Sequence, residues 1–105
     1  MTGEVNYINN KVLKYEWNSA KNARNKTKHG IGFEAAEGFD WRTAIEIYNS
    51  RDDYGEDRWV AFGFIGVALY VMAYTEHAEN IRIISLRRAT KKEEKSYAQG
   101  TETTD

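Results

Sequence analysis

The most informative absence from this sequence is that of cysteine. None of the 105 residues is a cysteine, which excludes a disulfide framework and any metal site built on thiolates. No apolar run approaches the roughly 20 residues that a membrane-spanning helix needs. The N-terminal stretch also lacks the basic-then-apolar order of a secretory signal. The chain is therefore compatible with the reducing cytoplasm, where we expect the protein to act.

Several common kinds of catalytic site are missing as well. The two histidines, His29 and His77, are far apart in the sequence and lack the spacing of metal ligands. There is neither a Gly-rich phosphate loop nor a Ser-His-Asp arrangement. We therefore predict no metal and no other cofactor.

Length and composition are those of one small globular domain. The chain is 41% apolar and 30% charged, which is ordinary for a soluble protein with a single core. Residues 1–10 are polar with little periodicity, and we expect them to form a loosely ordered N-terminal extension. Residues 11–100 are expected to form the single domain, and residues 101–105 a disordered tail.

Charge is unevenly distributed along the chain, although the net charge is only −1. Residues 11–29 are basic, residues 34–57 are acidic, and residues 81–95, within the C-terminal third, are basic again. Such blocks indicate one face for an anionic partner and another that repels it. The alternative is that these charges only keep the surface solvated.

Hydrophobic periodicity predicts an α+β fold. Strands are expected over residues 12–17, 43–48, 58–65 and 68–75 and at the start of 81–90, and helices over 18–28, 33–39 and 91–99. Asn18 is a good N-cap for the first helix, and Gly30 and Gly100 are placed to end the first and last helices. Because short loops join the strands, we predict an antiparallel meander.

Residues 81–90 are predicted to begin as a strand, to contain three arginines and to lead into the last helix. In a regular strand Ile81, Ile83, Ser85 and Arg87 would share one side, and Arg82, Ile84, Leu86 and Arg88 the other. Thr90 then resembles an N-cap, with Glu93 completing a capping box. Arginines beside a helix N-terminus suit the oxygens of a phosphate, because guanidinium forks and free N–H groups both donate to them.

Several stretches of the sequence match a known family, in order and at compatible spacing. They are Lys14-Tyr15-Glu16-Trp17-Asn18, Lys21, Asn25-Lys26-Thr27-Lys28-His29-Gly30, Phe33-Glu34-Ala35-Ala36, Glu56-Asp57-Arg58-Trp59, Tyr70-Val71-Met72-Ala73-Tyr74-Thr75-Glu76, Ile81-Arg82-Ile83-Ile84-Ser85, Arg87-Arg88-Ala89-Thr90 and Glu93-Glu94. Together they resemble BrnT-type toxins over roughly residues 13–100.

This resemblance implies a RelE-like fold and a ribonuclease toxin of a type II toxin–antitoxin system. Such a toxin cleaves RNA without a metal and inhibits translation. The implied partner is a BrnA-type ribbon-helix-helix antitoxin, two copies of which pair with two toxins in a heterotetramer. Operator DNA is then bound only through the antitoxin, and no membrane is involved.

RNA can be cleaved by its own 2′-hydroxyl, a reaction that needs a base, an acid and cations for the charge that develops on the phosphate. Guanidinium groups supply the last of these, because they stay charged at physiological pH. The expected catalytic residues are Arg82, Arg58, His29 and Tyr74, and the residues expected to bind RNA phosphates are Lys28, Arg87 and Arg88.

Each of these residues also has a structural interpretation. Surface arginines commonly only solubilise a protein. His29 and Lys28, at a helix C-terminus, complement the helix dipole there. Tyr74 packs its ring in a sheet on the alternative interpretation, and His77 is read as a solvent-exposed turn residue. The main competing function is a non-catalytic RNA-binding or protein-interaction module on the same fold.

Overall fold

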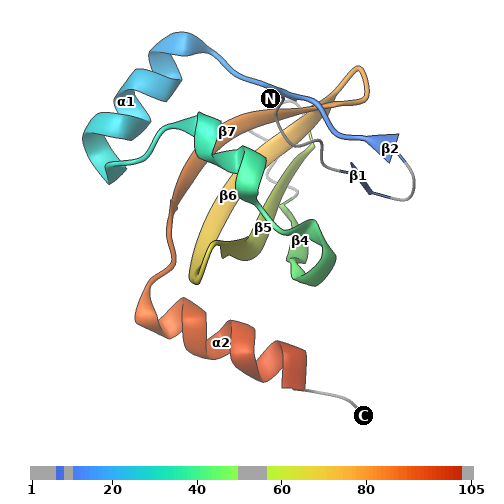
Figure 1. The fold of residues 1–105 in the computed structure, drawn as a ribbon, viewed down its shortest axis with the longest axis vertical. Coiled ribbons are helices and arrows are strands. Elements are labelled where there is room, and N and C mark those ends of the chain that lie inside the picture. The colour runs from blue at the N-terminus through green and yellow to red at the C-terminus, as the bar shows by residue number, and fades with distance from the viewer. Residues whose placement is uncertain (1–6, 9–10, 50–56, 103–105) are drawn as a thin grey trace.

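The computed structural model of the protein describes residues 7–8, 11–49 and 57–102. A five-stranded mixed sheet with the order β3-β7-β6-β5-β4 forms its centre (Figure 1). The strands of this sheet are β3 (Tyr15–Glu16), β4 (Ile45–Asn49), β5 (Arg58–Ile65), β6 (Ala68–His77) and β7 (Asn80–Arg88). The other elements are β1 (Tyr7–Ile8), β2 (Lys11–Val12), helix α1 (Ser19–His29), the 3-10 helices η1 (Phe33–Gly38) and η2 (Trp41–Thr43), and helix α2 (Lys91–Glu102). This α+β architecture with a C-terminal helix confirms the predicted fold class.

The two predictions for the chain ends fall largely outside the described residues. Within the expected N-terminal extension, the structure describes only Tyr7–Ile8, which pair with Lys11–Val12 in a short antiparallel hairpin. At the other end, α2 is described as far as Glu102. The acidic loop between β4 and β5 is likewise outside them for residues 50–56.

The predicted antiparallel meander is present, and one further strand makes the sheet mixed. Strands β4 to β7 pair antiparallel in chain order. Strand β3 then adds to β7 in parallel, with Tyr15 beside Ile81 and Glu16 beside Arg82. The strand expected over residues 12–17 is thus two short strands in different sheets: β2 pairs with β1, and β3 pairs with β7 and ends at Glu16, where the chain leaves for α1.

The regular alternation predicted for β7 is wrong beyond Ile83. Tyr74 pairs with Ile83 and Ala73 with Ser85, so Ile84 is an extra residue, as in a β-bulge. The bulge returns Leu86 to the buried side that Ile83 occupies. Arg82 pairs with Thr75, and Arg87 pairs with Val71. Because Val71 and Thr75 are four residues apart in β6 and so point to the same side of it, Arg82 and Arg87 lie on one face of the sheet rather than on opposite faces.

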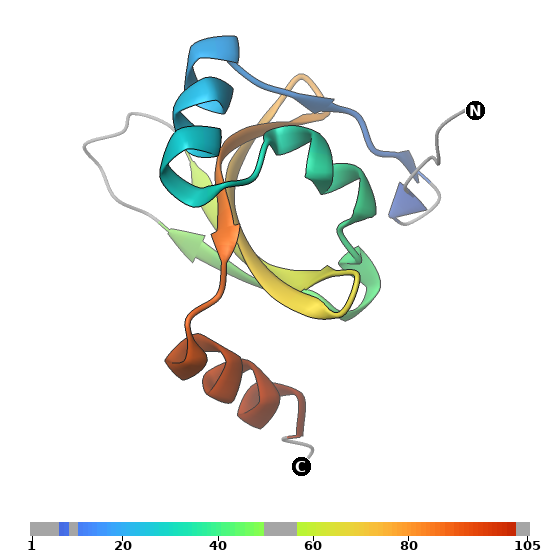
Figure 2. The same cartoon turned by 60° about the vertical axis from the view of Figure 1, so that its left-hand side comes forward.

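The core lies on the concave side of the curved sheet, where the chain from β3 to η2 crosses it (Figure 2). Its buried side chains are Phe33, Ala36, Phe39, Ala61, Met72, Tyr74, Ile81, Ile83 and Leu86. The ring of Phe39 lies so close to β5 that a Cβ on Gly63 would approach it to 2.5 Å. Burial of this apolar surface is the main term that favours folding. We call this side the core face and the opposite side the outer face.

Helix capping follows the sequence prediction at one helix and departs from it at another. Asn18 Oδ1 accepts a hydrogen bond of 3.0 Å from the Lys21 N–H, and Gly30 takes the left-handed conformation at the end of α1 with φ 76°. Gly100 does not end α2, which continues to Glu102. A Cβ on Gly100 would lie 3.3 Å from Ile45 Cδ1, so this glycine permits a close approach between α2 and β4.

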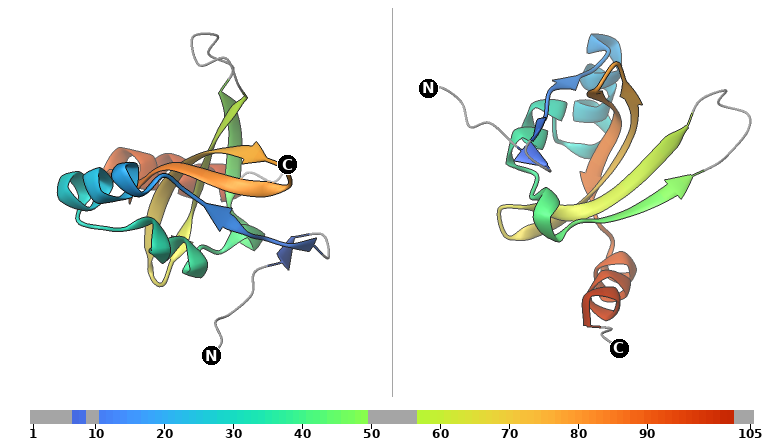
Figure 3. Two further views of the ribbon diagram at one scale, coloured as in Figure 1. Left: turned by 90° about the horizontal axis from the view of Figure 1, so that it is seen from above. Right: turned by 90° about the vertical axis from the view of Figure 1, so that its right-hand side faces the viewer.

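Helix α2 lies beyond one end of the sheet, and the β4–β5 hairpin reaches away from the remaining strands (Figure 3). Tyr97 connects α2 to the domain, because its hydroxyl donates to the Thr43 carbonyl at 2.6 Å and its ring meets Phe64 edge to face. Among the described residues, no helix is both long and apolar enough to span a membrane.

Candidate active site

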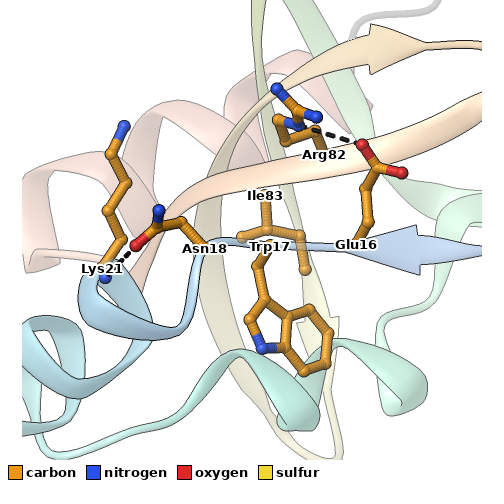
Figure 4. A pocket seen from close by; sticks show the side chains of 6 residues that line it. All are labelled: Glu16, Trp17, Asn18, Lys21, Arg82 and Ile83. Carbon is orange, nitrogen blue, oxygen red and sulfur yellow. Dashed lines mark hydrogen bonds and ion pairs between the residues drawn. The ribbon is translucent and has the colours of Figure 1, made fainter.

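Side chains from three strands meet at one end of the outer face. Glu16 of β3 accepts a hydrogen bond of 2.9 Å from Arg82 Nε of β7 (Figure 4). The same carboxylate oxygen lies 2.7 Å from Nδ1 of His77, the last residue of β6. Asn80 Nδ2 donates to the other carboxylate oxygen at 3.1 Å. A carboxylate, an imidazole and a guanidinium are therefore held together beside solvent.

The hairpin between β6 and β7 brings His77 to Arg82. Its turn consists of Ala78 and Glu79, both with positive φ (52° and 73°), as a two-residue type I′ turn requires. This turn places His77 opposite Asn80 and Thr75 opposite Arg82. His77 thus lies one diagonal step from Arg82 on the same face, within reach of a long side chain.

The protonation of this cluster follows from its hydrogen bonds. The Asn80 amide lowers the pKa of Glu16 most strongly, and the hydrogen bonds from Arg82 and His77 lower it further. Glu16 is therefore ionised at neutral pH and can only accept. We accordingly assign the proton of His77 to Nδ1, where it is donated to Glu16, and the 3.3 Å approach of Arg82 Nη2 to Nδ1 is then a contact between two donors.

A pocket of about 420 Å³ opens next to this cluster, lined by Glu16, Trp17, Asn18, Lys21, Arg82 and Ile83. The side chains of Lys21 and Arg82 extend to the same side of the segment that joins β3 to α1, and Trp17 points to the other side (Figure 4). The N-terminus of α1 lies at this pocket and has no acidic residue in its first turn. The charges of Lys21 and Arg82 and the positive end of the helix dipole favour an anion here, and they outweigh the single negative charge of Glu16, which is paired with Arg82.

A second basic cluster consists of Lys28 and His29 at the end of α1 and of Arg87 and Arg88 at the end of β7, just before α2. Arg87 donates two hydrogen bonds of 2.8 Å to the two carboxylate oxygens of Glu93. Glu93 also accepts from the Thr90 N–H, and Thr90 Oγ1 accepts from the Glu93 N–H, which confirms the predicted capping box. The guanidinium of Arg88 lies 5.7 Å from the ring centre of Tyr70. An RNA phosphate at Arg87 would thus compete with the carboxylate of Glu93.

This capping arrangement should make stability depend on pH in a specific way. The hydrogen bond from Arg87 is the largest cause that lowers the pKa of Glu93, from 4.5 to about 2. Because the folded pKa is the lower one, the stabilisation is complete above pH 4.5 and is lost as pH falls towards about 2. We expect Glu93→Gln to reduce the free energy of unfolding at pH 7, and this difference from wild type to shrink over that range.

Urea unfolding at a series of pH values measures the difference. Glu94→Gln is the matched control, because the Glu94 side chain makes no hydrogen bond or ion pair within the part of the chain that the structure describes. A Glu93→Gln difference that stays constant from pH 7 to pH 3 would show that the Arg87 contact does not stabilise the ionised carboxylate.

His29 lies at the opposite end of α1 from the pocket. Partial burial lowers its pKa most, and the positive charges of Lys28 and Arg87 lower it further. Its imidazole is therefore neutral at physiological pH, close to the second basic cluster. The structure brings His29, Lys28 and Arg87 together, and it does not bring His29 to Arg82.

The other two predicted catalytic residues lie on opposite faces of the sheet. Tyr74 is 2% exposed on the core face, where its hydroxyl donates to Glu46 and its ring meets Trp41 edge to face. Burial is the largest cause that raises its pKa. Arg58 precedes Trp59, the partner of Tyr74, so alternation places Arg58 on the outer face that carries Arg82.

Three members of this site were not predicted as site residues from the sequence: Glu16, Lys21 and His77. His77 is indeed half exposed, but its reading as a solvated turn residue overlooked the Glu16 contact. The spacing of the turn carried a usable signal, because a two-residue Ala78–Glu79 turn places His77 and Arg82 on one face. The parallel addition of β3, which brings Glu16, has no comparable local signal.

Comparison with protein families places most of this chain in one of them. Residues 17–93, well over half of the chain, match the model of a family described as the ribonuclease toxin BrnT of type II toxin–antitoxin systems. No curated protein matches the chain. The matched range contains Lys21, His77 and Arg82 and begins one residue after Glu16.

Proposed function

Because the chain belongs to the BrnT family of ribonuclease toxins of type II toxin–antitoxin systems, we propose that it cleaves RNA without a metal at the pocket between Lys21 and Arg82. RNA carries its own nucleophile, the 2′-hydroxyl next to each phosphate. Attack by this hydroxyl builds negative charge on the phosphate oxygens, and fixed positive groups stabilise that charge. The enzyme then needs only cations and proton-transfer groups.

The observation that supports this proposal is the composition of the pocket. Arg82 and Lys21 both line it and extend to the same side of the segment between β3 and α1, and the α1 N-terminus adds its positive dipole. The imidazole and carboxylate that proton transfer requires stand directly beside Arg82. Arg58 shares this face and is proposed to bind the substrate phosphate from β5.

The second basic cluster extends the proposed RNA surface along the outer face. Arg87 lies on the same face as Arg82, five residues further along β7. Lys28 and His29 lie close to Arg87. Arg88 follows Arg87 in β7 but lies on the other side of the strand, beside Tyr70. All three are proposed to hold neighbouring phosphates of the RNA strand. These contacts would add affinity that falls with rising salt, since phosphate binding releases counterions.

The biological setting is proposed from the family. Cleavage of RNA in the cytoplasm would inhibit translation, and an antitoxin would neutralise the enzyme. From the resemblance over residues 13–100 we further propose a RelE-like fold and a BrnA-type ribbon-helix-helix antitoxin, with two toxins and two antitoxins in a heterotetramer. Operator DNA would be contacted only by the antitoxin.

Purified protein incubated with RNA, with and without EDTA, tests the proposal. We expect cleavage at the same rate in both, because the proposed chemistry uses side chains alone. Expression in bacteria should arrest growth, and co-expression of the antitoxin should restore it. Intact RNA in both reactions would favour the non-catalytic binding module, and cleavage only without EDTA would contradict metal independence.

A further inference from the structure

We propose that His77 is the general base of this site, that its Nε2 removes the proton of the RNA 2′-hydroxyl, and that Glu16 is the positioning residue that holds the imidazole. This inference rests on the proposed ribonuclease function. It assigns the acid–base role to His77, which neither composition nor motif spacing predicts as a site residue.

The geometry of the His77 ring carries the assignment. Nδ1 donates to Glu16 Oε2 at 2.7 Å, so in the neutral imidazole Nε2 carries the lone pair and is the atom that can accept a proton. Within the described residues Nε2 makes no hydrogen bond. The side chain is 54% exposed, so a substrate hydroxyl can reach Nε2 from solvent.

Glu16 is itself held firmly. Asn80 and Arg82 donate to its two oxygens from β7, and its backbone lies in β3 beside Arg82. A carboxylate that is fixed and ionised orients the imidazole and stabilises the imidazolium that forms when Nε2 takes up a proton. The same contacts tie this pair to the guanidinium proposed to bind the phosphate.

The other proton-transfer candidates lack this arrangement. His29 lies at the far end of α1, among Lys28 and Arg87, away from Arg82. Tyr74 is buried on the core face, and its hydroxyl is engaged by Glu46. Of these three residues, His77 alone places a proton acceptor beside both Arg82 and the pocket.

In the proposed step His77 takes up a proton from the RNA while the phosphate is transferred within the RNA strand. The 2′-hydroxyl proton moves to Nε2 of His77 while the 2′-oxygen forms a bond to phosphorus. The bond from phosphorus to the 5′-oxygen breaks, its electron pair leaves on that oxygen, and solvent water supplies the proton that the oxygen gains. The imidazolium then returns its proton to the hydroxide left in solvent. The products are a 2′,3′-cyclic phosphate and a 5′-hydroxyl.

Two variants of His77 test the inference in the full chain. His77→Gln retains a donor for Glu16 but cannot transfer a proton at neutral pH, and His77→Ala leaves space for added imidazole. We expect each to slow RNA cleavage by roughly 100-fold or more. Imidazole should restore a concentration-dependent part of the rate to His77→Ala alone. Glu79→Gln, an exposed change in the neighbouring turn, is the control and should cleave at the wild-type rate.

The outcomes separate this inference from the proposed function. If both His77 variants cleave within about threefold of wild type while Arg82→Ala is inactive, the base assignment is wrong and the ribonuclease function stands. Failure of imidazole to restore any rate to a folded His77→Ala protein would assign His77 a structural role and overturn the inference. A wild-type protein that leaves RNA intact would overturn the ribonuclease function and this inference with it.

Discussion

Replacement of Asn25 by aspartate is expected to lower the free energy of unfolding by about 3 kcal/mol or more, a change among the largest that single substitutions cause. Asn25 is 6% exposed and lies in α1 beside β7. Its Nδ2 donates to the Leu86 carbonyl at 2.7 Å and to the Ile31 carbonyl at 2.9 Å, and its Oδ1 accepts from the Leu86 N–H at 3.2 Å. Strand β3 pairs with β7 only at Ile81 and Arg82. Further along β7, the side-chain amide of Asn25 takes the place of a neighbouring strand at Leu86.

An aspartate at this position has nearly the same shape as asparagine, but it replaces the amide group, a hydrogen-bond donor, with a charged acceptor. Its carboxylate cannot donate, so it would face two carbonyl oxygens with negative charge and leave both unsatisfied in a buried site. We expect the Tm to fall by roughly 12 °C or more in thermal unfolding followed by circular dichroism.

Asn18→Asp is the matched control, because it makes the same chemical change in the same helix. At the N-cap, Asn18 only accepts a hydrogen bond from the Lys21 N–H, a role that aspartate fills equally well next to the positive end of the helix dipole. Equal stability of the Asn25→Asp and Asn18→Asp proteins would contradict the edge-pairing role of Asn25.

The second large effect is expected on activity. Arg82→Ala should reduce RNA cleavage by about 100-fold to 1,000-fold, the range for removal of one preorganised donor to a developing oxyanion. Arg82→Lys should recover only part of this loss, because an ammonium keeps the charge but lacks the planar fork that matches phosphate oxygens. Single-turnover cleavage of a labelled RNA measures both rates.

The Arg82 substitution should leave the fold intact. The side chain is 47% exposed, and exposed ion pairs contribute at most about 1 kcal/mol to stability. Arg42→Ala is the control, because it removes another exposed arginine that is paired with a carboxylate, Asp40 at 3.3 Å, in a different part of the domain. Equal cleavage by the Arg82→Ala and Arg42→Ala proteins would place the phosphate site elsewhere.

Local features of the fold could be predicted from the sequence because local chemistry determines them. The Asn18 cap, the left-handed Gly30 and the capping box of Thr90 and Glu93 all occur where the residue types require them. Strand β5 begins and ends where the period-two pattern does. These elements depend on contacts between residues close in the chain.

Features that depend on distant contacts could not be predicted in this way. The parallel addition of β3 to β7 joins Glu16 to Arg82 across 66 positions. The bulge at Ile84 arises from the register against β6, and it reverses the face of every later residue in β7. The prediction that Arg82 and Arg87 face opposite sides was wrong for this reason.

In the candidate site, too, some features follow from local sequence and others depend on contacts between residues far apart in the chain. The motif pattern selected Arg82 and Arg58, which share the outer face and whose roles in catalysis stay predictions. It also selected Tyr74, whose hydroxyl turns into the core to Glu46, and it passed over His77, whose partner is supplied by a strand near the N-terminus. Sequence pattern selected Arg82 and Arg58 but not Lys21, and only the tertiary fold shows which proton-transfer groups lie beside Arg82.

The most direct test of the central claim is the chemical identity of the ends that wild-type protein produces when it cleaves RNA in the presence of EDTA. Attack by the 2′-hydroxyl at the pocket between Lys21 and Arg82 should yield a 2′,3′-cyclic phosphate and a 5′-hydroxyl, resolved by mass spectrometry of a short RNA. Products with a 3′-hydroxyl and a 5′-phosphate would instead require an attacking water, the usual outcome of metal-assisted hydrolysis, and would contradict the proposed mechanism.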